Sequence, residues 1–152
     1  MSDAPYVAVI GASDATAEQE CAAEIVGRVL AQHGAIVITG GRGGVMAAAS
    51  RGAAAAGGTA VGILPGTDRG EANRWVSVAI PTGLGELRNG LVIRAADVVV
   101  AVGGAYGTLS EIALALRAGL TVLGLDTWAI DGVERAGSPE QAATRALELA
   151  RR

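Results

Sequence analysis

The chain has 152 residues, a net charge of -3 and a hydrophobic content of 51%. This length and composition fit one domain with a buried core, so we expect residues 1–152 to form a single domain. The acidic balance argues against a nucleic-acid partner, because a surface that holds a phosphate backbone needs a basic face. The sequence has no lysine, which excludes a Schiff-base lysine for pyridoxal phosphate and the lysine of a phosphate-binding P-loop.

Cysteine and histidine are equally scarce. Cys21 and His33 are the single members of their types, so disulfides within the chain are excluded and we expect no metal site of the His/Cys type. Cys21 falls among alanines of a predicted helix, where we expect a buried, inert thiol. The N-terminal residues lack a basic segment, and no apolar run is long enough to span a membrane, which predicts neither secretion nor a membrane partner. We therefore expect a cytoplasmic protein.

Predicted strands and helices alternate from end to end. Apolar and β-branched runs predict strands over residues 6–11, 35–39, 59–64, 76–80, 97–102 and 121–125. Helical spacing of apolar residues and start signals predict helices over residues 17–33, 45–56, 85–96, 108–118 and 139–151. This alternation predicts an α/β fold, with a doubly wound, mostly parallel sheet and helices on both of its faces.

Helix start signals precede three of these helices. In a capping box, two side chains three residues apart satisfy backbone N–H groups at the helix start. That spacing occurs in the pairs Thr16/Gln19, Thr108/Glu111 and Ser138/Gln141. At the other end of the first helix, His33 is expected in the last turn, where a histidine complements the helix dipole.

The predicted helix over residues 85–96 carries an apolar stripe that we expect to face the core. Its members are Leu84, Leu87, Leu91 and Ala95, and Arg88 and Asn89 lie off the stripe. Gly90 costs roughly 1 kcal/mol relative to alanine inside a helix, so we expect a close contact at that position.

Glycine turns follow three of the predicted strands, at Gly11–Ser13, Gly40–Gly44 and Gly103–Thr108. Because parallel sheets bind ligands beyond the carboxyl ends of their strands, we expect these turns to meet at one cleft. A glycine turn leading into a helix presents free N–H groups and a partial positive charge, so the expected partner is a small phosphorylated ligand. The predicted ligand-binding residues are Gly11, Ser13, Gly40, Gly41, Arg42, Gly43, Gly44, Asn89, Gly103, Gly104, Gly107 and Thr108.

Four motifs in combination resemble a known superfamily. They are GGRGGVM at residues 40–46, GILPG at 62–66, TGL with ELRN at 82–89, and GGAYGTLSE at 103–111. They are similar to motifs of the Rossmann-like proteins once labelled lysine decarboxylases, whose best-known branch is the Lonely Guy (LOG) cytokinin-activating phosphoribohydrolases. The resemblance covers nearly the whole chain and implies a Rossmann-like fold.

The resemblance to the LOG branch implies catalytic roles for Arg88 and Glu111. These residues match the arginine and glutamate with which that branch cleaves the N-glycosidic bond of a nucleoside 5′-monophosphate. Asn89 stands where the branch has a lysine, and Gly103 and Ala105 replace a proline and a glycine of its phosphate motif. The Arg88–Asn89 pair, with GILPG and TGL, looks more like the molybdenum-cofactor carrier proteins, which bind a pterin phosphate.

The resemblance therefore implies a binding protein for a pterin or nucleotide phosphate, with molybdenum cofactor as a candidate ligand and no resident cofactor required. The alternative is a LOG-type phosphoribohydrolase, and a third reading is a sensor of nucleotide-derived signals. Glu111 either caps its helix through Thr108 or acts as a general base or a stabiliser of the sugar cation. Arg88 is either an ion-pair partner on the helix surface or a clamp on phosphate.

Oligomerisation is expected from two features. The predicted helix after Gly44 is rich in alanine, so its packing surface is thin and allows close approach of another element. The family resemblance also implies like subunits. We expect a homodimer or a homotetramer.

Overall fold

The computed structural model describes residues 3–151 and in this range contains one sheet of seven strands, all parallel. The strand order is β4-β3-β2-β1-β5-β6-β7, so the direction of winding reverses between β1 and β5. The predicted Rossmann-like, doubly wound α/β fold is confirmed. The strands are β1 (Tyr6–Gly11), β2 (Ile36–Thr39), β3 (Ala60–Leu64), β4 (Val78–Pro81), β5 (Val98–Val102), β6 (Val122–Leu125) and β7 (Val133–Arg135).

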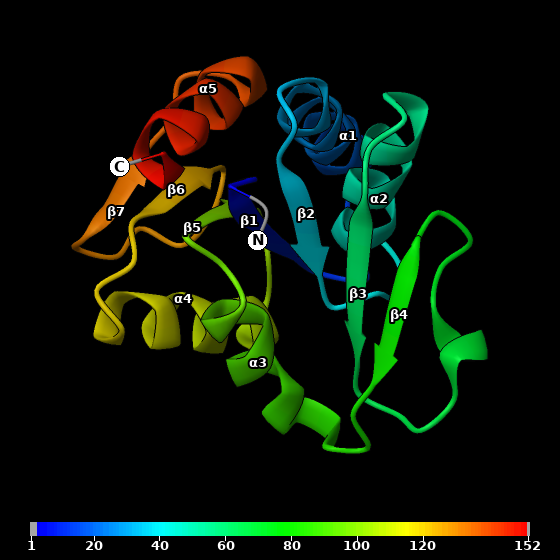
Figure 1. Ribbon diagram of the computed structural model, residues 1–152. Coiled ribbons are helices and arrows are strands. Elements are labelled where there is room, and N and C mark those ends of the chain that lie inside the picture. Colours follow the sequence, from blue (N-terminus) through cyan, green and yellow to red (C-terminus); the bar gives the residue numbers. More distant parts are fainter. Residues whose placement is uncertain (1–2, 152) are drawn as a thin grey trace.

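Helices cover both faces of the sheet (Figure 1). Helices α1, α2 and α5 lie on one face, and α3 and α4 lie on the other. No helix within residues 3–151 is both long and apolar enough to cross a membrane. The helices are α1 (Ala17–Gln32), α2 (Val45–Ala55), α3 (Arg88–Arg94), α4 (Tyr106–Arg117) and α5 (Pro139–Ala150), with short 3-10 turns η1 (Arg69–Glu71) and η2 (Gly85–Leu87).

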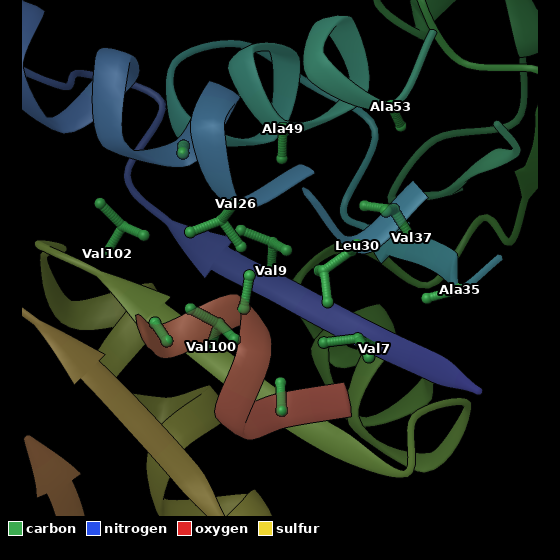
Figure 2. Close-up of a cluster of buried hydrophobic side chains, with 14 of the residues drawn as sticks. Val7, Val9, Val26, Leu30, Ala35, Val37, Ala49, Ala53, Val100 and Val102 are labelled. Atoms are coloured by element: carbon green, nitrogen blue, oxygen red, sulfur yellow. The ribbon is translucent and has the colours of Figure 1, made fainter. Parts of the chain in front are cut away.

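The face under α1, α2 and α5 holds the larger part of the core. Figure 2 shows valines of β1, β2 and β5 gathered near Val26 and Leu30 of α1 and the alanines of α2. The alanine-rich surface of α2 is used by α1 of the same chain. A Cβ atom on Gly27 of α1 would lie 2.1 Å from the carbonyl oxygen of Ala49 of α2, and one on Gly52 would lie 2.0 Å from that of Glu24. The two helices therefore pack with their backbones close together.

Of the three predicted capping boxes, one forms completely and a second forms in part. Thr16 and Gln19 make a complete capping box at the start of α1. Ser138 accepts a hydrogen bond from the backbone N–H of Gln141 at 3.1 Å, as predicted for α5. The Gln141 side chain accepts from the N–H of Gly137, one residue before the cap, at 3.1 Å. The third predicted cap, at α4, does not form and is described with the site.

The apolar stripe predicted for residues 85–96 is wrong for its three leucines, whereas its fourth member, Ala95, packs against the core. Leu84, Leu87 and Leu91 are 47%, 78% and 42% exposed. The buried residues of α3 are instead Asn89, Val92 and Ile93. The 3-10 turn η2 winds the chain more tightly than an α-helix, which rotates the residues of α3 relative to a continuous 3.6-residue pattern.

Gly90 also has no close neighbour in the described chain. A Cβ atom built there would meet nothing within 4 Å. The close contact expected at this glycine is therefore absent from residues 3–151.

Smaller differences concern the edge of the sheet and single residues. Strand β7 was not predicted, because its three residues include two charged ones and no apolar run. Its pairing with β6 defines it.

Cys21 is exposed, so the expectation of a buried thiol is wrong. It lies on the outward side of α1. His33 does end α1, with Nδ1 2.9 Å from the carbonyl oxygen of Val29.

Candidate functional site

A cavity of about 310 Å³ opens at the carboxyl ends of the central strands. It lies where the strand order reverses between β1 and β5, which is the expected position for a ligand in a doubly wound sheet. Residues from the turn after β1, the end of β2, helix α3 and the start of α4 surround it. The lining residues are Ile10, Gly11, Ala12, Ser13, Asp14, Gly40, Met46, Arg88, Asn89, Ala105, Gly107, Thr108 and Glu111.

The cavity gathers many of the predicted site residues and leaves others outside its lining. Arg88 and Glu111, separated in sequence, share its wall. The predicted ligand-binding residues in the lining are Gly11, Ser13, Gly40, Asn89, Gly107 and Thr108. Those outside the lining are Gly41, Arg42, Gly43, Gly44, Gly103 and Gly104. The binding and catalytic roles of all of them stay predictions.

Helix α4 begins with its backbone N–H groups uncapped. It starts at Tyr106, and the residue before it, Ala105, has no side chain that caps the helix. The helix has no acidic residue in its first turn. A helix start of this kind offers unpaired N–H groups and a partial positive charge to an anion. Because Gly107 and Thr108 in this turn line the cavity, the positive end of α4 faces it.

The predicted capping box of Thr108 with Glu111 is wrong. Thr108 is the third residue of α4, so the helix begins earlier than its sequence signal indicates. Gly103 and Gly104, with φ angles of 56° and 117°, allow the chain to turn from β5 directly into the helix. Glu111 is therefore free of the capping role that was one of its two alternatives.

Glu111 presents a buried carboxyl to the cavity. It is 8% exposed, and within residues 3–151 its side chain accepts no hydrogen bond. Burial raises the pKa of this carboxyl to about 7, and the Arg88 guanidinium nearby lowers the pKa in opposition. A carboxyl with that pKa can gain or lose a proton near neutral pH, which suits acid–base chemistry. In its protonated form it is neutral and does not repel a bound anion.

Arg88 links the ends of two strands. Its Nε donates to the carbonyl oxygen of Ile63 at 3.0 Å, and its Nη2 donates to that of Gly40 at 3.4 Å. A third donor, Nη1, bonds to Oδ1 of Asn89. Burial lowers the pKa of Arg88, with Glu111 raising it and Arg42 lowering it. The guanidinium has five N–H donors, so it is held in place and still has donors for a ligand.

Asn89 supports Arg88 from inside the protein. It is 8% exposed, although it was placed off the inner side of its predicted helix. Its Oδ1 accepts from Arg88, and its Nδ2 donates to Oγ of Ser110 at 3.5 Å. Asn89 therefore ties α3 to α4 and orients the arginine, in addition to lining the cavity.

The turn after β2 is occupied by contacts within the protein. Arg42 forms an ion pair with Glu71 of η1 at 3.1 Å, and Asn73 donates to its carbonyl oxygen at 2.9 Å. A Cβ atom on Gly44 would lie 2.2 Å from the carbonyl oxygen of Ala12. This turn thus packs on the turn after β1, and Arg42 points to the loop over residues 65–75 instead of lining the cavity.

Sequence reasoning missed several residues of the site. The lining also contains Asp14 and Met46, of which Asp14 had a usable signal because it follows directly on the Gly11–Ser13 turn. It also missed the loop after β6. There, Oγ1 of Thr127 donates to the carbonyl oxygen of Gly103 at 2.6 Å, and Nε1 of Trp128 donates to that of Ala105 at 3.2 Å.

Comparisons with known proteins agree with this architecture. A protein of Archaeoglobus fulgidus is 39% identical over 137 residues, which are 90% of each chain. The solved structure of the molybdenum cofactor binding protein from the phototrophic bacterium Rippkaea orientalis matches with a TM-score of 0.89 and 35% identity over 95% of this chain and 96% of that one. The molybdenum cofactor carrier protein of Chlamydomonas reinhardtii matches with a TM-score of 0.85 and 36% identity over 96% and 98% of the two chains.

A family model completes the assignment. The model of the SLOG cluster4 family matches residues 4–150, which is nearly the whole chain. The match includes every element of the sheet and every residue that lines the cavity. The protein belongs to the SLOG cluster4 family.

Proposed function

We propose that this protein binds and carries a small phosphorylated ligand, and that its cargo is the pterin phosphate of molybdenum cofactor. The observation that carries the proposal is the uncapped start of α4. It lies at the wall of the cavity where the strand order reverses between β1 and β5. Similarity to two solved proteins named for molybdenum cofactor supports the choice of pterin over other phosphates.

The residues of the cavity fit a phosphate group. The N–H groups of the first turn of α4 supply hydrogen bonds, and Gly107 lets an anion approach the backbone because no side chain covers it. Arg88 adds a fixed positive charge. Glu111 does not oppose the anion when its carboxyl is protonated, since the pKa of that group is about 7.

Gly107→Ala tests where the phosphate binds. A Cβ atom at this position would meet nothing within 4 Å in the protein, and alanine favours a helix more than glycine does. The variant should therefore keep its stability, while its methyl group enters the cavity. We expect the affinity for ribose 5-phosphate and for the stable pterin phosphate obtained by oxidising molybdopterin to fall at least about tenfold, equivalent to 1.4 kcal/mol.

Isothermal titration calorimetry measures both affinities, and thermal unfolding checks the fold. Unchanged affinity in Gly107→Ala would remove the start of α4 from the binding site. Wild-type protein that binds neither probe would overturn the carrier proposal itself.

The phosphoribohydrolase is the second candidate, and one observation favours it. Arg88 and the buried Glu111 share the cavity wall, and a carboxyl with a pKa of about 7 is suited to proton transfer at neutral pH. Incubation with a panel of nucleoside 5′-monophosphates, followed by chromatography of released bases, tests it. Release that disappears in Glu111→Gln would replace the carrier proposal with hydrolysis.

We also propose that the protein forms a homodimer or a homotetramer through α3 and α4. Four exposed leucines line one surface hollow, which we call the leucine face: Leu84 and Leu87 at η2, Leu91 on α3 and Leu114 on α4. Gly90 lies among them with open space around it, so a second copy would supply the close contact that this glycine predicts. The alanine-rich α2 no longer supports association, because α1 packs on it.

Leu87→Glu tests this assembly. A charge at the most exposed position of the leucine face should dissociate the oligomer. Size-exclusion chromatography with light scattering should give a dimer or larger species for wild type and a monomer for the variant. A monomeric wild type would refute the proposal. The cytoplasmic location and the absence of nucleic-acid and membrane partners stay predictions.

A further inference from the structure

Two aromatic side chains pair beside the start of α4, outside the lining of the cavity. The sequence has two tyrosines, two tryptophans and no phenylalanine, and Tyr106 stacks on Trp128 with ring centroids 6.2 Å apart and planes inclined by 28°. Tyr106 is the first residue of α4 and is 81% exposed. Its neighbours on both sides, Ala105 and Gly107, line the cavity. Tyr106 is therefore next in sequence to two residues of the lining, whereas Trp128 lines a separate hollow after β6.

The loop after β6 holds this pair in a defined place. Trp128 donates from Nε1 to the carbonyl oxygen of Ala105 at 3.2 Å, and Thr127 donates from Oγ1 to that of Gly103 at 2.6 Å. Asp126 adopts the left-handed conformation with a φ of 50°, which is uncommon outside glycine and accompanies a sharp change in chain direction. These contacts attach the loop to the turn that precedes α4. Trp128 is thereby fixed relative to the start of the helix, and Tyr106 lies against it.

The size of the cavity favours an additional surface for a larger ligand. Its volume of about 310 Å³ is at the low end of ligand pockets, which hold about 300–1,000 Å³. A phosphate at the start of α4 occupies part of that space. Little room is then left inside the cavity for a fused ring system attached to the phosphate, and the exposed ring of Tyr106, next to Ala105 of the lining, offers a flat apolar surface outside it.

We propose that Tyr106 stacks on the planar heteroaromatic ring of the ligand while the phosphate lies at the start of α4. This inference rests on the proposed function and adds the site for the ring. Trp128 is a positioning residue for this ring, because it stacks on Tyr106 and donates a hydrogen bond to the carbonyl oxygen of Ala105. The ligand class is a planar nitrogen heterocycle that carries a phosphate, such as a pterin or a purine.

Tyr106→Ala tests the inference with two probes that share the phosphate and differ in the ring. Alanine substitution of a stacking residue costs at least about fivefold in affinity. The affinity for the oxidised pterin phosphate should fall by that factor or more, while the affinity for ribose 5-phosphate stays within about twofold of wild type. Tyr106→Phe keeps the ring and should restore pterin binding. Tyr6→Ala, at the amino end of β1 and far from the cavity, is the matched control and should change neither affinity.

Calorimetric titration separates the outcomes. Equal losses for both probes in Tyr106→Ala would mean that the tyrosine acts on the helix start, which overturns the stacking role. Unchanged affinities for both probes would overturn it as well. Absence of binding of either probe to wild type would instead reject the proposed function, so the two failures are distinct.

Discussion

The start of α1 and the start of α4 follow neighbouring strands, yet they are built in opposite ways. Thr16 and Gln19 close the first with a complete capping box, and Glu18 and Glu20 add negative charge to its first turn. The start of α4 has neither a capping side chain nor an acidic residue. A capped start stabilises the protein, whereas an uncapped start at a cavity leaves its N–H groups for a ligand. Changes at α1 should therefore alter stability alone, and changes at α4 should alter binding.

Gly104→Ala should have the largest effect and should break the turn before α4. Gly104 has a φ of 117°, and a Cβ atom there would lie 2.4 Å from Cβ of Thr108. Backbone strain and overpacking together should cost on the order of 4 kcal/mol of unfolding free energy. Urea unfolding measures the loss. A variant as stable as wild type would mean that the turn relaxes without cost, and Gly107→Ala is the control in the same turn because its Cβ has free space.

Glu111→Gln should stabilise the protein at high pH. The carboxyl has an ordinary pKa of 4.5 and a folded-state pKa of about 7, so the folded chain binds more protons than the unfolded chain between these values. The contribution of Glu111 to the free energy of unfolding is therefore fully present below pH 4.5 and is lost as the pH rises through 7. Glutamine cannot ionise, so the variant should exceed wild type by up to about 3 kcal/mol at pH 8 and should show no such gain at pH 4.

Urea unfolding of both proteins at the two pH values tests this difference. Glu18→Gln in the first turn of α1 is the control, because its exposed carboxylate favours the helix start and its loss should not stabilise the protein. A Glu111→Gln variant that is less stable than wild type at pH 8 would show that attraction to Arg88 outweighs the cost of burial.

Thr16→Ala should have the smallest of these effects. The substitution removes the hydrogen bond from the N–H of Gln19 to Oγ1 of Thr16, which measures 3.1 Å. The loss of a helix cap costs about 1 kcal/mol. Thermal or urea unfolding should register this loss, while the affinity for ribose 5-phosphate stays unchanged. Weaker phosphate binding in Thr16→Ala would contradict the division of roles between the two helix starts.

Local sequence signals predicted the elements that depend on local physics. Buried strands such as β1 and β5 are continuous apolar runs, and the caps of α1 and α5 involve residues three positions apart. The glycine turns were also located correctly at the ends of β1, β2 and β5. The same local logic was wrong at Thr108 and Glu111, because the residues before them form the turn and let the helix begin earlier.

Local sequence signals did not predict contacts between segments that are distant in the chain. Asn89 is buried because its side chain joins Arg88 to Ser110 of another helix. Arg42 is directed away from the cavity by Glu71, a residue in a loop whose position depends on the fold. Neither pairing has a sequence spacing that identifies it.

The sequence by itself determined the α/β class, the order of most elements and the position of the turns that supply a phosphate site, because periodicity, capping and glycine conformation act over a few residues. Only the tertiary structure decided which candidates share one cavity and which leucines of η2, α3 and α4 stay exposed. It also brought Trp128 to the start of α4. These outcomes depend on how helices pack on a twisted sheet and on hydrogen bonds between segments far apart in the chain, and no local pattern records them.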